Sequence, residues 1–177
     1  MESSPRRLIV IHTDAQAHDF LERGGLPGFR TPNLSRLAAR GVQFSRAYSC
    51  NGVCVPARAS LMTGRYPLAH GVMNNHMNLH PDEPRMGRLF AEAGFQTGYF
   101  GKTHFGDDPS DMTGEGWRES FLDGDYKAYL TQKGLAGKYP EKVVPRRLPL
   151  RYWQAGPSEI PEELYFERVI ADRAADF

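Results

Sequence analysis

Short apolar runs that alternate with helical patterns constrain the fold of this chain most strongly. Residues 8–11 are a continuous apolar run rich in β-branched side chains, which is typical of a strand buried on both faces of a parallel sheet. Residues 42–48 alternate like a second strand, and residues 97–100 predict a third. Because helical patterns separate these runs, the sequence predicts a layered α/β domain.

Capping signals and apolar spacing predict the helices. The first spans residues 31–41, where Thr31 is a candidate N-cap and Gly41 a stop signal. The second begins near Pro56 and ends at Gly64. Two further helices are expected, one built on Met86, Leu89, Phe90 and Ala93, and one after Pro161 with Leu164, Ile170, Ala174 and Phe177 on one face.

Residues 107–157 differ from the rest because they show little periodicity and mix Asp, Gly, Pro and Lys with aromatic residues. A loop of that length is usually a functional lid or disordered, so we expect a long surface excursion here. Its aromatic side chains could stack on a sugar or enclose a cation, but packing on the lid's own core is the simpler interpretation. They include Trp117, Tyr126, Tyr129, Tyr152 and Trp153.

The charge balance excludes polyanion binding as a general property of the chain. Its 22 basic residues offset 21 acidic ones, whereas proteins that bind nucleic acids or anionic membranes carry a strong basic excess. The N-terminal apolar run is far too short to span a membrane and lacks the pattern of a secretory signal. We therefore expect a cytoplasmic protein, or a periplasmic one if a leader was removed, with no nucleic-acid or membrane partner.

Polar residues follow two of the predicted strands. Asp14 comes after the first strand, and Lys102 and His104 come after residues 97–100. Ligands of open α/β sheets bind beyond the carboxyl ends of the strands, so these side chains could share one crevice. Taken singly, Asp14 is more simply a cap or turn residue and His104 a surface histidine. Their shared position after strands is what favours a site.

A possible nucleophile lies at the start of the second predicted helix. Cys54 precedes Pro56, which places its sulfur near a helix N-terminus, where backbone N–H groups favour anions. Arg58 follows four residues later and could grip a tetrahedral oxyanion at the same point. A buried structural cysteine beside a solvated arginine explains this spacing equally well. Cys50 has no role that the sequence assigns, and two cysteines cannot form a disulfide framework.

The segment C-V-P-A-R at residues 54–58, followed by T-G-R at 63–65, resembles the sulfatase signature C-x-P-x-R-x4-T-G-R, whose cysteine is oxidised to formylglycine. Blocks at residues 31–48, 94–104 and 170–174 agree with that family in order and spacing. The chain is thus similar to the N-terminal part of the formylglycine-dependent sulfatases of the alkaline phosphatase-like superfamily. The resemblance implies an α/β sandwich with a central, mostly parallel sheet flanked by helices.

The same resemblance implies the domain organisation and the reaction. Residues 1–177 would be the N-terminal part of a single catalytic domain, incomplete in this chain, with residues 107–157 as a lid-like insertion. The activity would be hydrolysis of a small sulfate monoester through a formylglycine hydrate at a divalent metal, Ca²⁺ before Mn²⁺ or Mg²⁺. A formylglycine-generating maturation enzyme would be a partner.

The resemblance also implies roles for individual residues. Asp14 and the modified Cys54 would bind the metal, and Cys54 would also be the nucleophile. Arg58 would hold the hydrate, Lys102 would neutralise and bind a sulfate oxygen, and His104 would move the proton when sulfate is released. A sulfate ester needs such a set because its own negative oxygens face the attacking oxygen.

One departure from the family pattern favours an alternative function. Many sulfatases have a second aspartate where this chain has Ala15. Choline sulfatases and phosphonate monoester hydrolases share the single aspartate and contact the anion through an asparagine that matches Asn75. A phosphonate or phosphate ester hydrolase is therefore the alternative, although Lys102 and His104 keep the sulfatase pair. Asn75 is a candidate substrate-binding residue, and a turn residue explains it almost as well.

A second departure concerns the ligands that the family takes from later segments. The remaining metal ligands are absent from residues 1–177, and Ca²⁺ prefers six to eight oxygens. The helical pattern also reaches Phe177 without a stop signal. We expect this polypeptide to be inactive unless a missing C-terminal half or a second copy supplies the rest. A truncated fragment or one half of a split protein is the non-enzymatic alternative.

Overall fold

The computed structural model describes residues 7–14, 16–22, 25–104, 115–139 and 158–177. They fall into two compact units, Met1–Tyr48 and Ser49–Phe177. None of the helices formed by these described residues is long and apolar enough to cross a membrane.

The first unit contains a short 3-10 helix, η1 (His18–Phe20), and one α-helix, α1 (Pro32–Ala38). Thr31 is the N-cap of α1, as the sequence predicts. Its hydroxyl accepts a hydrogen bond from the backbone N–H of Glu22 (2.9 Å), and the Ser35 hydroxyl donates to the Glu22 carboxylate (2.7 Å). Glu22 therefore ties the preceding loop to the first turn of α1.

The strands predicted in the first unit are wrong. Residues 8–11 and 42–48 form no strand, and Ile9 and Ile11 are 80% and 78% exposed. An apolar run becomes a strand only where a neighbour pairs with its backbone N–H and C=O groups. The one sheet among the described residues lies in the second unit and does not include these segments. Helix α1 also ends three residues before the predicted stop at Gly41.

The second unit begins with three helices: α2 (Cys54–Thr63), α3 (Pro67–His70) and α4 (Met86–Glu92). Helix α2 starts two residues earlier than the sequence predicts, and Gly64 ends it in the left-handed conformation (φ 67°). A glycine adopts this conformation without the steric penalty that a Cβ atom brings. The predicted positions of α2 and α4 are confirmed.

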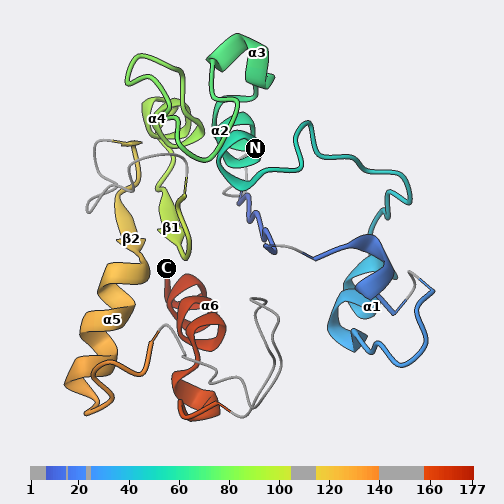
Figure 1. Cartoon of the computed structure of the whole chain (residues 1–177), viewed down its shortest axis with the longest axis vertical. Coiled ribbons are helices and arrows are strands. Elements are labelled where there is room, and N and C mark those ends of the chain that lie inside the picture. Colours follow the sequence, from blue (N-terminus) through green and yellow to red (C-terminus); the bar gives the residue numbers. More distant parts are fainter. Residues whose placement is uncertain (1–6, 15, 23–24, 105–114, 140–157) are drawn as a thin grey trace, which may run out of the picture. The chain divides into compact units, whose positions relative to one another are not determined.

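A parallel pair of strands follows these helices. Strand β1 (Gly98–Phe100) pairs with β2 (Glu119–Phe121), as Figure 1 shows. In this pairing Tyr99 lies opposite Ser120. The structure thus confirms the strand predicted at residues 97–100, shortened by one residue. The described residues also form α5 (Asp123–Gln132), η3 (Glu162–Leu164) and α6 (Phe166–Asp176). The last two confirm the helical pattern predicted after Pro161.

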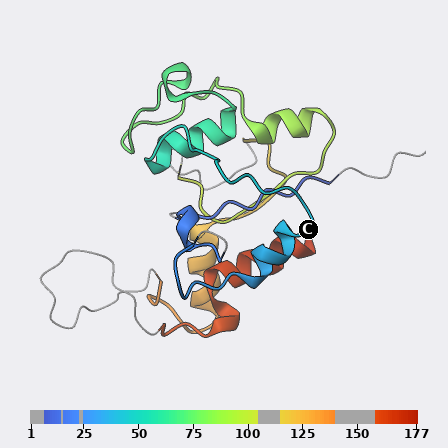
Figure 2. The ribbon, with the colours of Figure 1, turned by 90° about the vertical axis from the view of Figure 1, so that its right-hand side faces the viewer.

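Helices cover both faces of the strand pair. Successive strand residues point to opposite faces, so Tyr99 and Phe100 join different apolar clusters. Tyr99 packs with Met62 of α2 and Met86 of α4, whereas Phe100 packs on the core between α5 and α6. Figure 2 shows α2 and α4 on one side of the strands and α5 and α6 on the other. The α/β class with parallel strands and flanking helices is confirmed. The buried residues of the α5–α6 core are Phe121, Tyr126, Leu130, Ile160 and Val169.

The irregular surface excursion expected over residues 107–157 is wrong for its middle part. Strand β2 and helix α5 both lie there, and Tyr126 and Leu130 of α5 are almost fully buried. A three-residue strand and a mostly polar helix leave little periodicity to detect, which is why the pattern looked irregular. Residues 107–114 and 140–157, with Tyr152 and Trp153, lie outside the described residues.

Candidate active site

Cys54 is the first residue of α2, as its predicted place near a helix N-terminus requires. The preceding turn is held by Asn51, whose Oδ1 accepts a hydrogen bond from the N–H of Val53 (2.7 Å). The first N–H groups of a helix have no partner within the helix, so this end favours a negatively charged group. Cys54 is half-buried, whereas Cys50 is exposed. The structure therefore separates the two cysteines by environment.

Arg58 lies one turn after Cys54 and connects α2 to the turn that follows β1. Only 6% of it is exposed, so the solvated arginine considered from the sequence is wrong. Its Nη1 donates to the backbone carbonyls of Lys102 (2.7 Å) and Thr103 (3.4 Å). A charged donor makes these bonds stronger than those between neutral groups. The structure thus brings together two motif segments that lie 44 residues apart.

The turn that carries Lys102 and His104 has a distinctive backbone. Gly101 has φ 114°, and its N–H donates to the carbonyl of Phe121 on β2 (2.9 Å). His104 has φ 52°, the only positive φ at a non-glycine residue that the structure describes. Because this conformation costs a residue with a Cβ roughly 1–2 kcal/mol, surrounding contacts must hold it. One of them is the Tyr99 hydroxyl, which donates to the Lys102 carbonyl (2.7 Å).

Asn75 lies in the segment between α3 and α4 and reaches the N-terminal end of α2. Its Oδ1 accepts a hydrogen bond from the N–H of Val55 (2.9 Å), so it caps the helix beside Cys54. A hydrogen bond of this kind contributes about 0.5–1.5 kcal/mol to stability. The Nδ2 amino group of Asn75 is the part of the side chain that can donate to a ligand. Asn75 therefore lies where a substrate-binding residue is expected, and substrate binding itself stays a prediction.

Asp14 belongs to the first unit and Cys54 to the second, so the structure gives no geometry between these two predicted metal ligands. Within the parts of the chain that the structure describes, no group of three or more His, Cys, Asp or Glu side chains could hold a metal ion. Ca²⁺ prefers six to eight oxygen ligands. The described residues therefore do not complete a calcium site.

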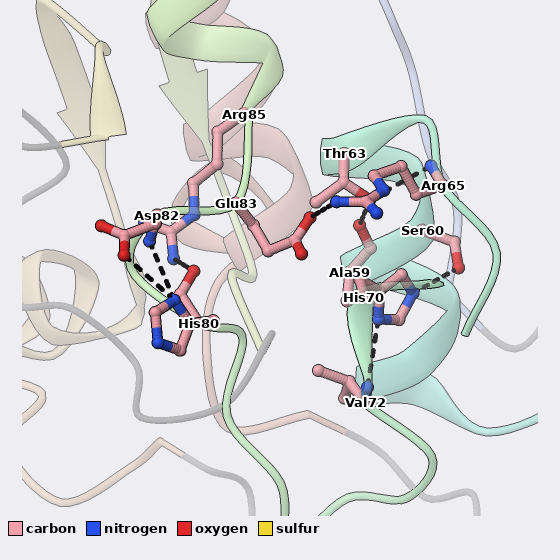
Figure 3. Close-up of polar contacts among 10 residues, drawn as sticks. All are labelled: Ala59, Ser60, Thr63, Arg65, His70, Val72, His80, Asp82, Glu83 and Arg85. Carbon is pink, nitrogen blue, oxygen red and sulfur yellow. Dashed lines mark hydrogen bonds and ion pairs between the residues drawn. The ribbon is translucent and has the colours of Figure 1, made fainter. Parts of the chain in front are cut away.

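A buried pair supports the middle of α2 from the side of α3 (Figure 3). The Ser60 Oγ and His70 Nε2 atoms are 2.8 Å apart, and His70 Nδ1 accepts a hydrogen bond from the N–H of Val72 (3.2 Å). Because Nδ1 accepts, a neutral His70 carries its proton on Nε2 and donates it to Ser60. Burial lowers the pKa of His70, and the nearby Glu83 carboxylate partly opposes that shift.

Arg65, the last residue of the T-G-R segment, holds the C-terminal end of the same helix. Its Nη1 pairs with the Glu83 carboxylate (2.7 Å), and its N–H donates to the Thr63 hydroxyl (3.2 Å). The Thr63 hydroxyl in turn donates to the carbonyl of Ala59 (2.8 Å), as Figure 3 shows. Ser60, His70 and Glu83 were not among the residues predicted from the sequence, because no spacing rule marks partners from separate elements.

These contacts give the site a rigid frame. Helix α2 presents Cys54 at its N-terminus, and Arg58 fixes the backbone beside Lys102 and His104. A half-buried cysteine, an arginine, a lysine and a histidine thus lie on adjoining segments, and cationic groups of this kind suit the binding of an anionic group.

Both a protein-family model and curated relatives match this chain over most of its length. The family model described as Sulfatase matches residues 6–177. The uncharacterized sulfatase YidJ of Escherichia coli strain K12 is 33% identical over 177 residues, which covers 96% of this chain and 34% of that protein. The chain spans between 20% and 34% of the length of curated relatives that it matches.

Two solved structures extend the comparison to the fold. The crystal structure of Ps i-CgsB is 31% identical, with a TM-score of 0.57 over 68% of this chain and 31% of that one. The phosphonate monoester hydrolase SpPMH from Silicibacter pomeroyi is 26% identical, with a TM-score of 0.63 over 82% of this chain and 32% of that one. The described fold is thus that of the alkaline phosphatase-like superfamily.

Proposed function

Because the chain belongs to the sulfatase family, we propose that the protein hydrolyses a sulfate monoester. The observation that carries the proposal is the pair of hydrogen bonds from Arg58 to the carbonyls of Lys102 and Thr103. They join the helix that begins with the modifiable cysteine to the turn that carries a lysine and a histidine. The proposed anion site needs both segments, because the nucleophile comes from α2 and the lysine and histidine come from the turn.

The proposed roles follow from the charge and position of each side chain. Cys54, once converted to formylglycine and hydrated, supplies an oxygen nucleophile with a second hydroxyl for the release of sulfate. Arg58 holds that group at the start of α2, and the Lys102 ammonium neutralises a sulfate oxygen. His104 moves the proton at its imidazole as sulfate leaves, and the Asn75 amide binds the anion. These positive charges lower the barrier because the transition state concentrates charge on oxygen.

A divalent cation is the proposed cofactor, with Ca²⁺ first and Mn²⁺ or Mg²⁺ as alternatives. Asp14 and the modified Cys54 are the ligands that this chain would contribute. The described residues contain no group of three or more His, Cys, Asp or Glu side chains that could hold a metal ion. We therefore propose that the other ligands lie outside the described residues.

The state of Cys54 tests the proposal most directly. When the protein is produced with a formylglycine-generating enzyme, mass spectrometry of the peptide that holds Cys50 and Cys54 should find an aldehyde at Cys54 and a thiol at Cys50. The Cys54→Ala variant should lose turnover of an aryl sulfate, and the matched Cys50→Ala variant should keep it. A thiol at Cys54, together with no turnover in the natively expressed protein, would favour the non-catalytic alternative.

The alternative is hydrolysis of a phosphonate or phosphate ester on the same scaffold. Ala15 and Asn75 favour it, and so does the likeness to SpPMH, which is named a phosphonate monoester hydrolase. The discriminating measurement is kcat/KM for an aryl sulfate and for a phosphonate monoester with the same leaving group. A higher value for the sulfate supports the first proposal, and a strong preference for the phosphonate replaces it by the second.

A further inference from the structure

The carbonyl oxygen of Lys102 accepts hydrogen bonds from two side chains on different elements. Arg58 Nη1 reaches it from α2 (2.7 Å), and the Tyr99 hydroxyl reaches it from β1 (2.7 Å). We propose that Tyr99 is a positioning residue, whose hydroxyl sets the backbone turn that orients Lys102 and His104. The proposal rests on the proposed function for the roles of those two side chains.

The Tyr99 ring is held in place by its neighbours. Its backbone is paired with Ser120 in the strand pair, and the ring meets Trp117 with the centroids 5.2 Å apart at 64°. Trp117 in turn lies against Gly87 of α4, where an added Cβ atom would come within 2.7 Å of the indole. Tyr99 therefore presents its hydroxyl from a packed position, and little conformational entropy is lost when the hydrogen bond forms.

The geometry of the peptide group explains how one carbonyl can orient two side chains. The Lys102 carbonyl and the Thr103 N–H belong to one planar unit, so a rotation of that plane changes ψ of Lys102 and φ of Thr103 together. His104, in its left-handed conformation (φ 52°), follows directly. Two donors that approach from different elements, Arg58 and Tyr99, restrain the angle of this plane more tightly than either donor does alone.

The same chain offers a matched control. The Tyr126 hydroxyl also donates to a backbone carbonyl, that of Leu164 (2.8 Å), within the α5–α6 core. Tyr99→Phe and Tyr126→Phe therefore remove the same group and the same kind of hydrogen bond. Only the first bond is made at the turn that carries Lys102 and His104. A general loss of stability would affect both variants, and a change in the turn would affect only Tyr99→Phe.

The first measurement needs no substrate. NMR spectra of the natively expressed protein should show that Tyr99→Phe moves the backbone amide signals of Thr103 and His104, and that Tyr126→Phe leaves them in place. Trp117→Phe keeps the Tyr99 hydroxyl but reduces the packing against the Tyr99 ring, so a smaller change in the same signals is expected. Unchanged signals in Tyr99→Phe, or equal changes in the two tyrosine variants, would overturn the proposal.

The second measurement is steady-state turnover of an aryl sulfate. Tyr99→Phe should lower kcat about tenfold and change KM less than about twofold, because misplacing catalytic groups slows chemistry more than binding. Tyr126→Phe should change neither constant by more than about twofold at a temperature where both variants are folded. A fall in kcat of equal size in both variants would also overturn the proposal. If the unsubstituted protein turns over no sulfate ester, the proposed function fails, and the amide signals still decide the role of Tyr99.

Discussion

Helices α1 and α2 start from similar local sequences and end in different environments. Both have a proline in their first turn and apolar residues at helical spacing. In α1 no residue is buried, and Leu37 is 63% exposed. In α2 most residues are buried, and Met62 is only 7% exposed. The full set of buried α2 residues is Val55, Pro56, Arg58, Ala59, Ser60 and Met62.

The difference shows what a local pattern can and cannot specify. Propensity and capping make a helix, but most of the stability of a short helix comes from the surfaces that pack on it. Helix α2 is enclosed by α3, α4 and the strand pair, and so it can hold Cys54 and Arg58 in fixed positions. Side-chain substitutions at equivalent places on α1 and α2 should therefore have unequal effects.

The largest difference is expected for apolar truncation. Met62→Ala on α2 should destabilise the protein by about 2–5 kcal/mol, because it leaves a cavity against Met86 and Tyr99. Leu37→Ala on α1 should change the free energy of unfolding by less than about 0.5 kcal/mol, because the side chain is exposed. Urea unfolding of both variants gives the comparison. An equal cost for Leu37→Ala would mean that this side chain is covered in the protein in solution.

Truncating an arginine on each helix should give a smaller difference. Arg58→Ala should cost about 1.5–3 kcal/mol, because it removes charged hydrogen bonds to two backbone carbonyls, and it should also abolish turnover. Arg36→Ala removes only an exposed bond to Asn33 (3.0 Å) and should cost less than about 0.5 kcal/mol. Thermal unfolding and aryl sulfate turnover measure the two effects. Retained activity in Arg58→Ala would contradict the role given to Arg58.

Glycine-to-alanine substitutions after the two helices should differ by about 1–2 kcal/mol in their effect on the free energy of unfolding. Gly64 has φ 67°, so Gly64→Ala should destabilise the protein by roughly that amount. Gly41 has no positive φ, and an added Cβ atom would meet only the carbonyl of Leu37 at 3.7 Å. Gly41→Ala should therefore be neutral or slightly stabilising. Melting temperatures of the pair provide the test, and equal losses would contradict it.

The smallest effect is a dependence of stability on pH that comes from the α2 side. Burial lowers the pKa of His70 in the folded state below its ordinary value of 6.5, with Arg65 assisting and Glu83 opposing. Below pH 6.5 the unfolded chain therefore binds a proton that the folded chain does not, and stability falls as the pH is lowered from 7 towards 5.

The slope from this one histidine is less than about 1.4 kcal/mol per pH unit. Unfolding free energies between pH 5 and 8 measure it. His70→Gln should flatten that dependence, and His18→Gln in the first unit serves as the control. An unchanged slope in His70→Gln would assign the dependence to other groups.

Much of the candidate site could be predicted from the sequence. The spacing of Cys54, Pro56 and Arg58 predicted a cysteine at a helix N-terminus, and the glycine-bounded strand before Lys102 predicted the second segment. Such signals are local, since a cap, a helix stop and a signature each depend on a few consecutive residues. The hydrogen bonds that hold these segments could not be predicted. Tyr99 bonds to the Lys102 carbonyl and Asn75 to the N–H of Val55 because the fold brings them together, and no spacing marks such pairs.

Local signals in the amino-acid sequence were enough to predict the α/β class, the positions of α2, α4, β1 and α6, and the family to which the chain belongs. Contacts between distant segments were needed to establish that residues 8–11 and 42–48 form no strand, that β2 pairs in parallel with β1, and that Arg58 is buried against a turn 44 residues away. These three features have one cause. A strand needs the hydrogen bonds of a neighbouring strand, and a buried charge needs acceptors, and both are supplied by distant parts of the chain.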